Sequence, residues 1–400
     1  MILALVLLAV SLALLGATYG APEAGMARLA VSATLAMVFA AYLTPVLGEA
    51  ARRFGILDRP DGRLKRHAEP VPYLGGLAVG LAFCLSLALV FRFDQRVTGL
   101  LLAGAVALLL GLVDDLGRLS WRVKLAGQML AVLVLLKSGV VSDITALSPA
   151  ANLALSAVWL LTLINAFNLI DIADGLAPGV ALFAAAGFVV VAVFDGAALL
   201  AIFAATLFGA LAGFLPFNFP PARIYLGDAG SMFLGITLGG VSLAGSYTAS
   251  SPYGLLAPVL ILAVPLFDTV FVMAVRLARG TNPCLGSPDH FAVRLRRAGL
   301  SAPRIALIAC AATVLTSAAG IALLAAPAPY ARLIVVGAFG VLLVAALALL
   351  RLPGPRPAVA TDVEVQSVES AWAVVGIDDG MFDTELPATP TPTRRGGARA

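Results

Sequence analysis

The sequence has few charged residues: Asp, Glu, Lys and Arg make up 12% of its 400 residues. Soluble globular domains carry roughly 25% charged residues. In contrast, 61% of this chain is hydrophobic, and its mean hydropathy is +1.01. A soluble globular protein is therefore excluded, and the composition indicates a protein that lies in a membrane.

Cysteine and histidine are also scarce, with three and two residues. Cys84 and Cys310 fall in apolar stretches and Cys284 in a polar one, so the sequence offers neither a disulfide framework nor the spacing of a zinc site. Basic patches interleaved with aromatic residues are missing as well, which argues against nucleic acid as a partner. A cation site in this chain would have to use oxygen ligands.

Long apolar runs occupy most of the chain. They predict an all-α, polytopic integral membrane protein with about 11–12 transmembrane helices, most of them with the ~20 residues that a bilayer demands, and with cytoplasmic active-site loops. The segments are approximately 1–19, 27–48, 73–91, 98–116, 122–140, 152–170, 176–194, 197–217, 230–248, 254–276, 304–326 and 330–351. Segment 1–19 lacks a basic n-region, so a cleaved signal peptide is the weaker interpretation.

Lys and Arg residues are divided unequally between the two sets of loops. With this segmentation one side carries sixteen of them, and the other carries five: Arg28, Arg92, Arg96, Lys137 and Arg332. Because positively charged loops stay in the cytoplasm, the richer side is expected to face the cytosol. The membrane domain spans residues 1–352, and residues 353–400 form a Pro-rich polar tail that we expect to be cytoplasmic and largely disordered.

Asn165, Asn168 and Asp171 recur every three residues at the predicted end of one helix, and Asp174 follows them. On a helix, this spacing places the first three side chains on one face. Acidic side chains at membrane depth are costly unless they pair, meet water or bind a cation, so they indicate a functional site. The alternative is a polar helix end that reaches into the cytosol.

Asp114 and Asp115 end another apolar helix. Adjacent residues point about 100° apart on a helix, so we expect one carboxylate to hold a cation and the other to act as a base or as its support. Lys124 and Gln128, four residues apart on the next helix, can face the same site. The alternative is an acidic pair that a nearby arginine, Arg118 or Arg122, neutralises.

Asp228 lies between two glycines just before a further membrane segment, in the run Asn218–Ser231. It is either a ligand-binding carboxylate or the cap of its own helix. The two histidines lie in separate basic loops, His67 beside Lys65 and His290 four residues before Arg294. A single histidine in a loop is usually a solvent-exposed residue without a role in binding or catalysis, but these basic neighbours favour anion binding.

The five aspartates therefore share one membrane face with basic loops. Such an oxygen-rich set suits a hard cation such as Mg²⁺, with Mn²⁺ as the alternative, which completes its coordination with water and substrate phosphate. The pattern fits cation-dependent phosphoryl transfer at the cytosolic membrane surface.

Five ordered motifs between about residues 50 and 300 resemble the polyprenyl-phosphate N-acetylhexosamine-1-phosphate transferases of glycosyltransferase family 4, in particular the bacterial type that uses UDP-GlcNAc and undecaprenyl phosphate. The motifs are the Gly55–Gly76 loop, Asp114-Asp115 with Lys124 and Gln128, Asn165–Gly175, Asn218–Ser231, and Pro265–Asp268 with Arg276.

This resemblance implies an enzyme that transfers a sugar-1-phosphate, above all GlcNAc-1-phosphate, from a UDP-sugar to polyprenyl phosphate and releases UMP. The reaction would be the first membrane step of cell-envelope glycan synthesis. The resemblance also implies a multi-pass protein of the bacterial inner (plasma) membrane, Mg²⁺ as cofactor, and a homodimer.

The resemblance further implies roles for individual residues. The catalytic residues would be Asp114, Asp115, Asp171, Asp174 and Asp228. The metal ligands would be Asp228, Asp115 and Asp171. The substrate contacts would be Lys65, His67, Lys124, Asn165, Asn168, Asn218, His290 and Arg294.

Two positions depart from the family's pattern. The family's late loop carries two or three histidines, whereas the run from His290 to Leu295 keeps only the first, and Ile172 replaces a common glycine. These departures leave open a different sugar or a catalytically inactive homologue. The further alternatives are the phospho-N-acetylmuramoyl-pentapeptide transferase of peptidoglycan synthesis and, from another class, a cation-coupled transporter.

Overall fold

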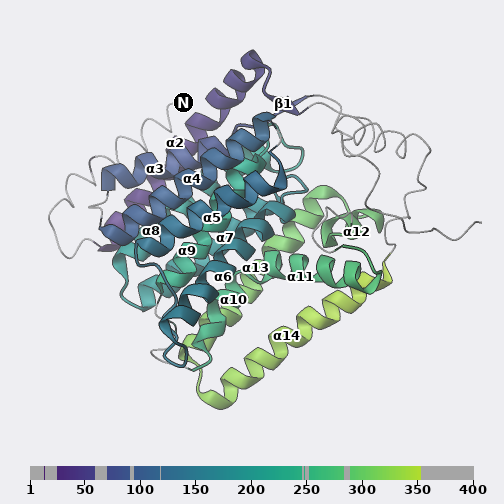
Figure 1. Ribbon diagram of the computed structural model, residues 1–400. Coiled ribbons are helices and arrows are strands. Elements are labelled where there is room, and N and C mark those ends of the chain that lie inside the picture. The colour runs from purple at the N-terminus through teal and green to yellow at the C-terminus, as the bar shows by residue number, and fades with distance from the viewer. Residues whose placement is uncertain are drawn as a thin grey trace, which may run out of the picture. The chain divides into compact units, whose positions relative to one another are not determined.

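The computed structural model describes residues 13, 25–58, 70–90, 94–117, 119–245, 247, 252–282 and 289–352, and these are almost entirely helical (Figure 1). Two short strands, β1 (Leu57–Asp58) and β2 (Val71–Pro72), pair antiparallel. The helices are α2 (Gly25–Phe54), α3 (Gly75–Val90), α4 (Gln95–Gly117), α5 (Trp121–Lys137), α6 (Pro149–Ile170), α7 (Leu176–Phe194), α8 (Ala198–Asn218), α9 (Gly227–Ala244), the 3₁₀ turn η1 (Gly254–Leu256), α10 (Ala257–Ile261), α11 (Ala263–Ala278), α12 (Phe291–Arg297), α13 (Ala302–Ala325) and α14 (Ala328–Arg351).

The predicted all-α polytopic fold is confirmed, because every apolar segment from 27–48 onward coincides with a helix or a broken helix pair. Among the described helices, seven are long and apolar enough to cross a membrane, or eight if the bent pair α10–α11 is one span. That number is below the predicted 11–12 because α3 and α5, with 16 and 17 residues, are too short, and because α9, which has 18 residues, is not apolar enough. Segment 1–19, apart from residue 13, and the tail 353–400 lie outside the described residues.

The predicted continuous segment 254–276 is broken in the structure. α10 and α11 meet at an angle of 76°, and Leu262 between them leaves helical geometry. The sequence supplies a reason, since Pro265 in the first turn of α11 has no N–H to donate to the carbonyl of Ile261. The bend sends α11 away from α10 and lets it pack against α6.

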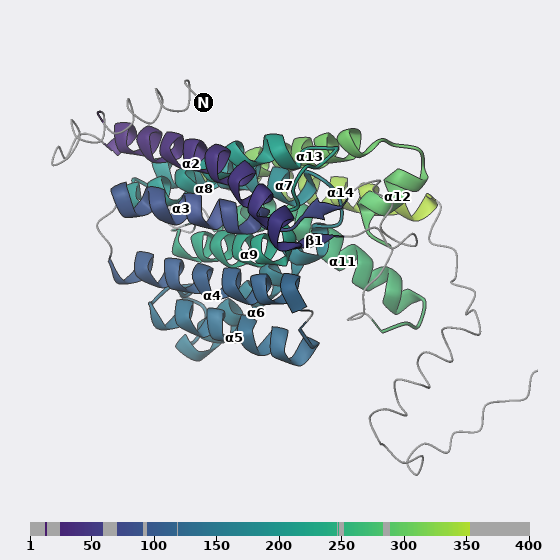
Figure 2. The same cartoon turned by 90° about the horizontal axis from the view of Figure 1, so that it is seen from above.

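Helix α9 occupies the centre of the bundle, and nearly all of its residues are buried. Figure 2 shows it running between α3 and α4, and it also packs against α6. Glycines make these contacts close: a Cβ atom added to Gly76 would collide with the backbone of Gly230, and one added to Gly235 would collide with Ile164. This packing brings the ends of α4, α6 and α9 together at one side of the bundle.

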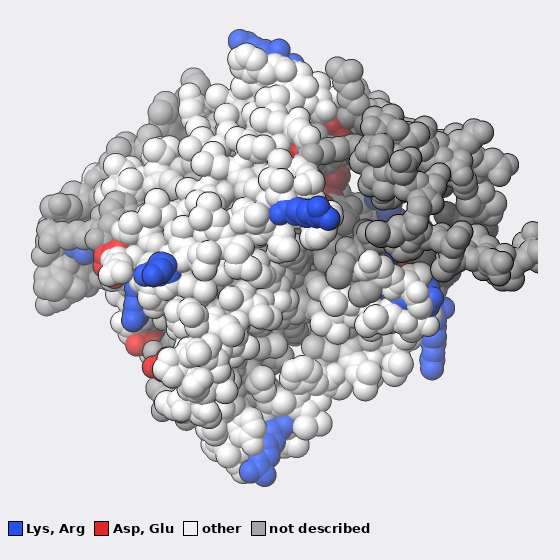
Figure 3. Space-filling model, in the orientation of Figure 1, with Lys and Arg blue, Asp and Glu red and all other residues white. Residues whose placement is uncertain are grey.

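The described surface is mostly apolar. On the face shown in Figure 3, Lys and Arg occupy a few separate places on an otherwise uncharged surface. Helix α14 is the least buried of the candidate membrane spans, with 6% of its apolar window buried, and many of its large hydrophobic side chains are exposed. Such a surface is stable in contact with lipid tails rather than with water.

Candidate active site

A cluster of polar side chains lies where four helix ends meet. The last turn of α4 contributes Asp114 and Asp115, and the first turn of α5 contributes Lys124. Helix α6 contributes Asn168 near its end, and α9 contributes Asp228 in its first turn. Ser120 caps α5 by accepting a hydrogen bond from the backbone N–H of Val123, which fixes the start of α5 just before Lys124.

The ammonium of Lys124 is the centre of this cluster. Its Nζ donates to Asp228 Oδ2 at 2.6 Å, to Asp114 Oδ2 at 2.9 Å and to Asn168 Oδ1 at 3.1 Å. Asp114 also accepts a hydrogen bond from the backbone N–H of Leu119 at 2.7 Å. Among the described residues, the neutralising partner of Asp114 is therefore Lys124 rather than Arg122, whose guanidinium instead lies over the ring of Trp121. Arg118, the other arginine considered, lies outside the described residues.

Asn168 connects the α6 end to the α9 start. Its Nδ2 donates to Asp228 Oδ1 at 2.8 Å and to Ser231 Oγ at 3.0 Å. Both carboxylate oxygens of Asp228 are thus held, one by the amide and the other by Lys124. This arrangement fixes the rotamer of Asp228, which is what a group that orients a substrate or a cation requires.

Asp115 caps helix α9 from outside. Its Oδ1 accepts from the backbone N–H of Asp228 at 2.9 Å and its Oδ2 from that of Ala229 at 3.0 Å. Gly227 allows this approach, since its φ is +73° and a Cβ there would lie 2.7 Å from Asp115 Oδ2. The proposed capping role of Asp228 is wrong: the cap of α9 comes from α4, and the N-cap residue Leu226 makes no side-chain cap bond.

Gly111 on α4 should be essential for this geometry. A Cβ at this position would collide with the backbone carbonyl of Asp228, so Gly111→Ala should push α4 and α9 apart. A displacement of about 1 Å at a catalytic group can cost roughly a hundredfold in rate, and we expect that loss in the turnover described below. Gly117→Ala on the same helix is the control, because a Cβ there meets nothing within 4 Å. Full activity of Gly111→Ala would contradict this packing.

Asp171 follows the end of α6 and is half-buried. Desolvation of its carboxylate, and then the negative charges of Asp228, Asp115 and Asp174, raise the pKa of Asp171 well above its ordinary value. Its carboxylate makes no hydrogen bond to the residues that the structure describes. The charged form of Asp171 is therefore disfavoured unless a cation other than Lys124 lies beside it.

Asn218 and Asp174 fasten two loops at the edge of the cluster. Asn218 Oδ1 accepts from the N–H of Gly175 at 2.9 Å, and its Nδ2 donates to the carbonyl of Ile224 at 2.8 Å. Asp174 Oδ2 accepts from the N–H of Ala222 at 2.9 Å. These contacts give both residues a positioning role, because they tie the loop after α6 to the loop before α9.

Asn165 lies deeper in the bundle and pairs with Gln128. The two amides exchange hydrogen bonds at 3.1 and 3.3 Å, and Asn165 Nδ2 also donates to the carbonyl of Leu161. The amide group of Asn165 is therefore occupied by a contact between α6 and α5. A direct contact with substrate stays a prediction for this residue.

His290 and Arg294 belong to a second polar group, which Asp268 and Asp289 complete. His290 Nδ1 lies 2.6 Å from Asp268 Oδ2 on α11, and Asp268 Oδ1 accepts from the N–H of Phe291 at 2.9 Å. Arg294 is 2% exposed and donates to Asp289 Oδ1 at 2.8 Å and to the carbonyl of Leu349 at 3.2 Å. Arg294 thus joins α12 to α14, and its predicted phosphate contact stays a prediction. Lys65 and His67 lie outside the described residues.

Two tyrosines at the site were not among the predicted residues. Tyr225, in the loop before α9, lies with its ring centroid 6.2 Å from that of Tyr73, and the planes are tilted by 54°. Burial, and then the charges of Asp174 and Asp58, raise the pKa of Tyr225, so the phenol stays protonated beside the carboxylates. Tyr225 was visible in the run Asn218–Ser231, but an aromatic residue in a membrane protein is usually assigned to the core.

The oxygen donors of the cluster could hold a divalent cation only together with other ligands. Among the residues that the structure describes, no three His, Cys, Asp or Glu side chains converge closely enough to hold a metal ion by themselves. However, Mg²⁺ uses only one or two carboxylates and fills its other positions with water and phosphate. Carboxylate and amide oxygens around a bound ammonium, with Asp171 unpaired among the described residues, fit a hard cation in chemistry and in charge.

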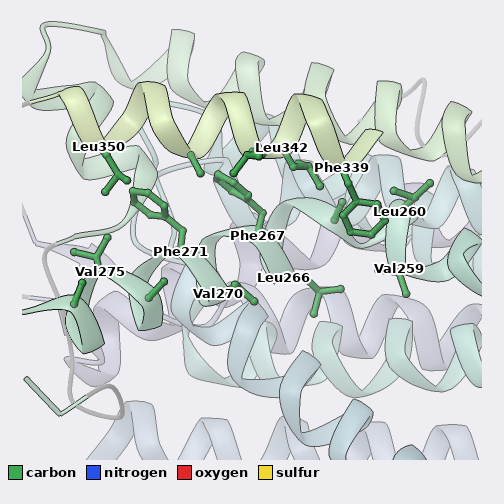
Figure 4. A pocket seen from close by; sticks show the side chains of 15 residues that line it. Val259, Leu260, Leu266, Phe267, Val270, Phe271, Val275, Phe339, Leu342 and Leu350 are labelled. Carbon is green, nitrogen blue, oxygen red and sulfur yellow. The ribbon is translucent and has the colours of Figure 1, made fainter. Parts of the chain in front are cut away.

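A separate apolar groove opens beside the bent helix pair. It has a volume of about 700 Å³ and lies between the α10–α11 pair and α14. In Figure 4, Phe267 and Phe271 of α11 face Leu342 and Leu350 of α14 across it. The groove is shaped by the bend, since α11 turns away from α10 while α14 runs past both (Figure 1).

The chain is similar to known glycosyl transferases. The model of glycosyl transferase family 4 matches residues 97–246. A decaprenyl-phosphate N-acetylglucosaminephosphotransferase of Mycolicibacterium smegmatis is 30% identical over 337 residues, 75% of this chain and 82% of the relative. An undecaprenyl-phosphate alpha-N-acetylglucosaminyl 1-phosphate transferase of Thermotoga maritima is 32% identical over 249 residues, 62% of this chain and 75% of the relative. A probable undecaprenyl-phosphate N-acetylglucosaminyl 1-phosphate transferase of Bacillus subtilis is 29% identical over 285 residues, 69% of this chain and 79% of the relative.

Proposed function

Because the chain belongs to glycosyl transferase family 4, we propose that it transfers GlcNAc-1-phosphate from UDP-GlcNAc to a polyprenyl phosphate and releases UMP. The relatives' names give the transferred group and the lipid acceptor. Apart from the relatives' names, the observation that supports the proposal is a hydrogen-bonded network where four helix ends meet. The network consists of Asp114, Lys124, Asn168 and Asp228.

The reaction exchanges one phosphoanhydride bond for another. An oxygen of the polyprenyl phosphate attacks the phosphorus that carries the sugar, and the bond from that phosphorus to the bridging oxygen breaks. The bridging oxygen leaves with its electron pair on UMP, and the lipid keeps a diphosphate-linked sugar. Because the nucleophile is already an anionic phosphate, alignment and charge neutralisation matter more than a strong base.

The residues of the site supply these two requirements. Lys124 carries its charge on a flexible stem that can reach the diphosphate. Asn168 and Asp115 hold Asp228 and its helix in place. Asp228 and Asp171 are the residues that would hold Mg²⁺, or Mn²⁺ as the alternative, while Asp115 supports them through its charge. When bound, such a cation neutralises charge on the transferred phosphoryl group.

The two substrates would approach from different sides of this site. The nucleotide would lie at the loops that Asn218 and Asp174 fasten, where Tyr225 offers a flat aromatic face on which a uracil can stack. The polyprenyl chain would lie in the apolar groove between α11 and α14. We further propose that the site faces the cytosol of the bacterial inner membrane, in accord with the distribution of Lys and Arg.

Ala346→Trp in the groove tests the placement of the lipid chain. The indole would fill part of the groove that Ala346 lines, so the KM for polyprenyl phosphate should rise at least about tenfold, the effect of a misfit of one or two carbon atoms in an apolar pocket. The KM for UDP-GlcNAc should stay the same. Val336→Trp is the matched control, since Val336 lies on the same helix and is 71% exposed. An unchanged KM for polyprenyl phosphate in Ala346→Trp would show that the lipid chain does not bind in this groove.

Turnover by the purified protein tests the proposed function. UMP release would be measured in detergent with undecaprenyl phosphate, MgCl₂ and, in turn, UDP-GlcNAc, other UDP-sugars and UDP-MurNAc-pentapeptide. We expect Mg²⁺-dependent release from UDP-GlcNAc. Release from UDP-MurNAc-pentapeptide alone would assign the protein to the peptidoglycan reaction, and no release with any donor from folded protein would contradict the proposal.

A further inference from the structure

Lys124 occupies the place of a cation in this structure. Its three ammonium hydrogens point to three oxygen acceptors on three other helices, Asp114 Oδ2, Asn168 Oδ1 and Asp228 Oδ2, at 2.6 to 3.1 Å. Lysine has three donors, so its capacity is fully used. These oxygens are the kind that Mg²⁺ prefers, and the two carboxylates are only 11% and 35% exposed.

We propose that Lys124 is a tethered counter-ion, which neutralises the site before a divalent cation binds and is displaced toward the substrate when it does. The inference rests on the proposed function, because it assumes a cation-dependent diphosphate reaction at this site. It adds a defined sequence of contacts: the ammonium leaves Asp228 and Asn168, and the same ammonium then becomes free to bind the diphosphate.

Charge and geometry both indicate that a divalent cation displaces the ammonium of Lys124 and does not share the oxygen ligands with it. Asp228 Oδ2 and Asn168 Oδ1 already face the ammonium, and a divalent cation on either oxygen would stand within a few ångströms of it. Two cations at that separation repel each other strongly in a partly buried site. The cation with the larger charge keeps the carboxylate, and the ammonium moves.

The position of Lys124 allows that movement. It lies in the first turn of α5, and its side chain is 21% exposed, so part of the side chain already meets solvent. Four rotatable bonds let the ammonium swing while the backbone stays fixed by the Ser120 cap. Asn168 keeps its second contact, to Ser231, so the carboxylates do not depend on Lys124 alone for their orientation.

Thermal unfolding of the purified, substrate-free protein at increasing MgCl₂ concentrations tests whether Mg²⁺ and the ammonium of Lys124 compete for the same oxygen atoms. At constant ionic strength, the MgCl₂ concentration at half-maximal stabilisation should fall at least about fivefold in Lys124→Gln, the lower end of the coupling that two linked binding events show. Lys124→Arg, which keeps the charge, should bind Mg²⁺ no more tightly than the unmodified protein. Arg122→Gln is the matched control, because it removes a positive charge from the same helix turn. Its MgCl₂ concentration at half-maximal stabilisation should change less than that of Lys124→Gln.

A second measurement uses the unmodified protein and does not depend on a folded variant. The sequence has three lysines, Lys65, Lys124 and Lys137. Acylation of the amines, followed by peptide mass spectrometry, should label Lys124 several-fold faster with saturating MgCl₂ than without it. Lys137, exposed in the last turn of α5, should be labelled at the same rate in both conditions.

The outcomes separate this inference from the proposed function. An unchanged or higher Mg²⁺ midpoint in Lys124→Gln, slower labelling of Lys124 with Mg²⁺, or no stabilisation of any variant by Mg²⁺ would overturn it. If the unmodified protein releases UMP with Mg²⁺ while these results are negative, only the counter-ion role fails. If the midpoint and the labelling change as expected but no donor yields UMP, the counter-ion role stands and the proposed reaction fails.

Discussion

Asp228→Asn is expected to lower the rate of UMP release by about a thousandfold, the upper range for the loss of one preorganised hydrogen-bonding group in an active site. Both carboxylate oxygens of Asp228 are engaged in the structure, Oδ1 by Asn168 and Oδ2 by Lys124. Asparagine keeps the size of the side chain but removes its charge and replaces one acceptor with a donor. That donor would face either the ammonium of Lys124 or the amide of Asn168.

The substitution should affect chemistry more than folding. Asp228 lies in the first turn of α9, and the cap of that helix comes from Asp115, which the substitution leaves in place. We therefore expect the KM values to change less than kcat and the thermal midpoint to stay close to that of the unmodified protein. Asp143→Asn, at an exposed position between α5 and α6, is the control for the same chemical change. If the turnover of Asp228→Asn were within tenfold of that of the unmodified protein, Asp228 would not have a central catalytic role.

Asp115→Ala is expected to reduce both stability and activity. The N–H groups of Asp228 and Ala229 would lose their acceptor in a buried place, which costs roughly 1–3 kcal/mol. The N-terminus of α9 would also lose the negative charge that its dipole favours. Because the same helix turn carries Asp228, the rate of UMP release should fall by at least about a hundredfold.

The comparison with Asp115→Asn separates the two effects. Asparagine keeps one oxygen for one of the two N–H groups, so its thermal midpoint should lie between those of Asp115→Ala and the unmodified protein. Its rate should nevertheless fall, since the charge beside Asp228 is lost. Thermal unfolding followed by tryptophan fluorescence measures the first quantity and UMP release the second. An Asp115→Ala protein that melts at the normal temperature would show that the cap is not needed.

The helical fold and the identity of the central residues could be predicted because both follow from local sequence. Apolar runs gave the positions of the helices from 27–48 onward. The four-residue spacing of Lys124 and Gln128 predicted that both face the Asp114–Asp115 site. Lys124 does contact Asp114, whereas Gln128 pairs with Asn165 instead. The three-residue spacing of Asn165, Asn168 and Asp171 was correct for the two asparagines, which both contact α5, whereas Asp171 follows the last residue of α6 and leaves helical geometry. It did not reveal that Asn165 is occupied by Gln128, because that depends on the depth of α5 beside α6.

Other features depend on contacts between distant segments, so the sequence could not reveal them. The capping of α9 by Asp115 joins residues more than a hundred positions apart, and a local sequence pattern favours Asp228 for that role. The bend at Leu262 turned a continuous apolar segment into two helices and created the groove. The burial of Arg294 against Asp289 depends on how α12 packs, which a basic loop sequence does not indicate.

The most direct test of the central claim is the mass of the lipid product, measured together with the nucleotide that is released. Purified protein would be supplied with UDP-GlcNAc, undecaprenyl phosphate and MgCl₂, and the products separated and weighed by mass spectrometry. We predict UMP and a lipid that has gained both the sugar and one phosphate. Release of UDP, with a lipid that has gained the sugar alone, would contradict sugar-1-phosphate transfer and the roles assigned here to Lys124 and Asp228.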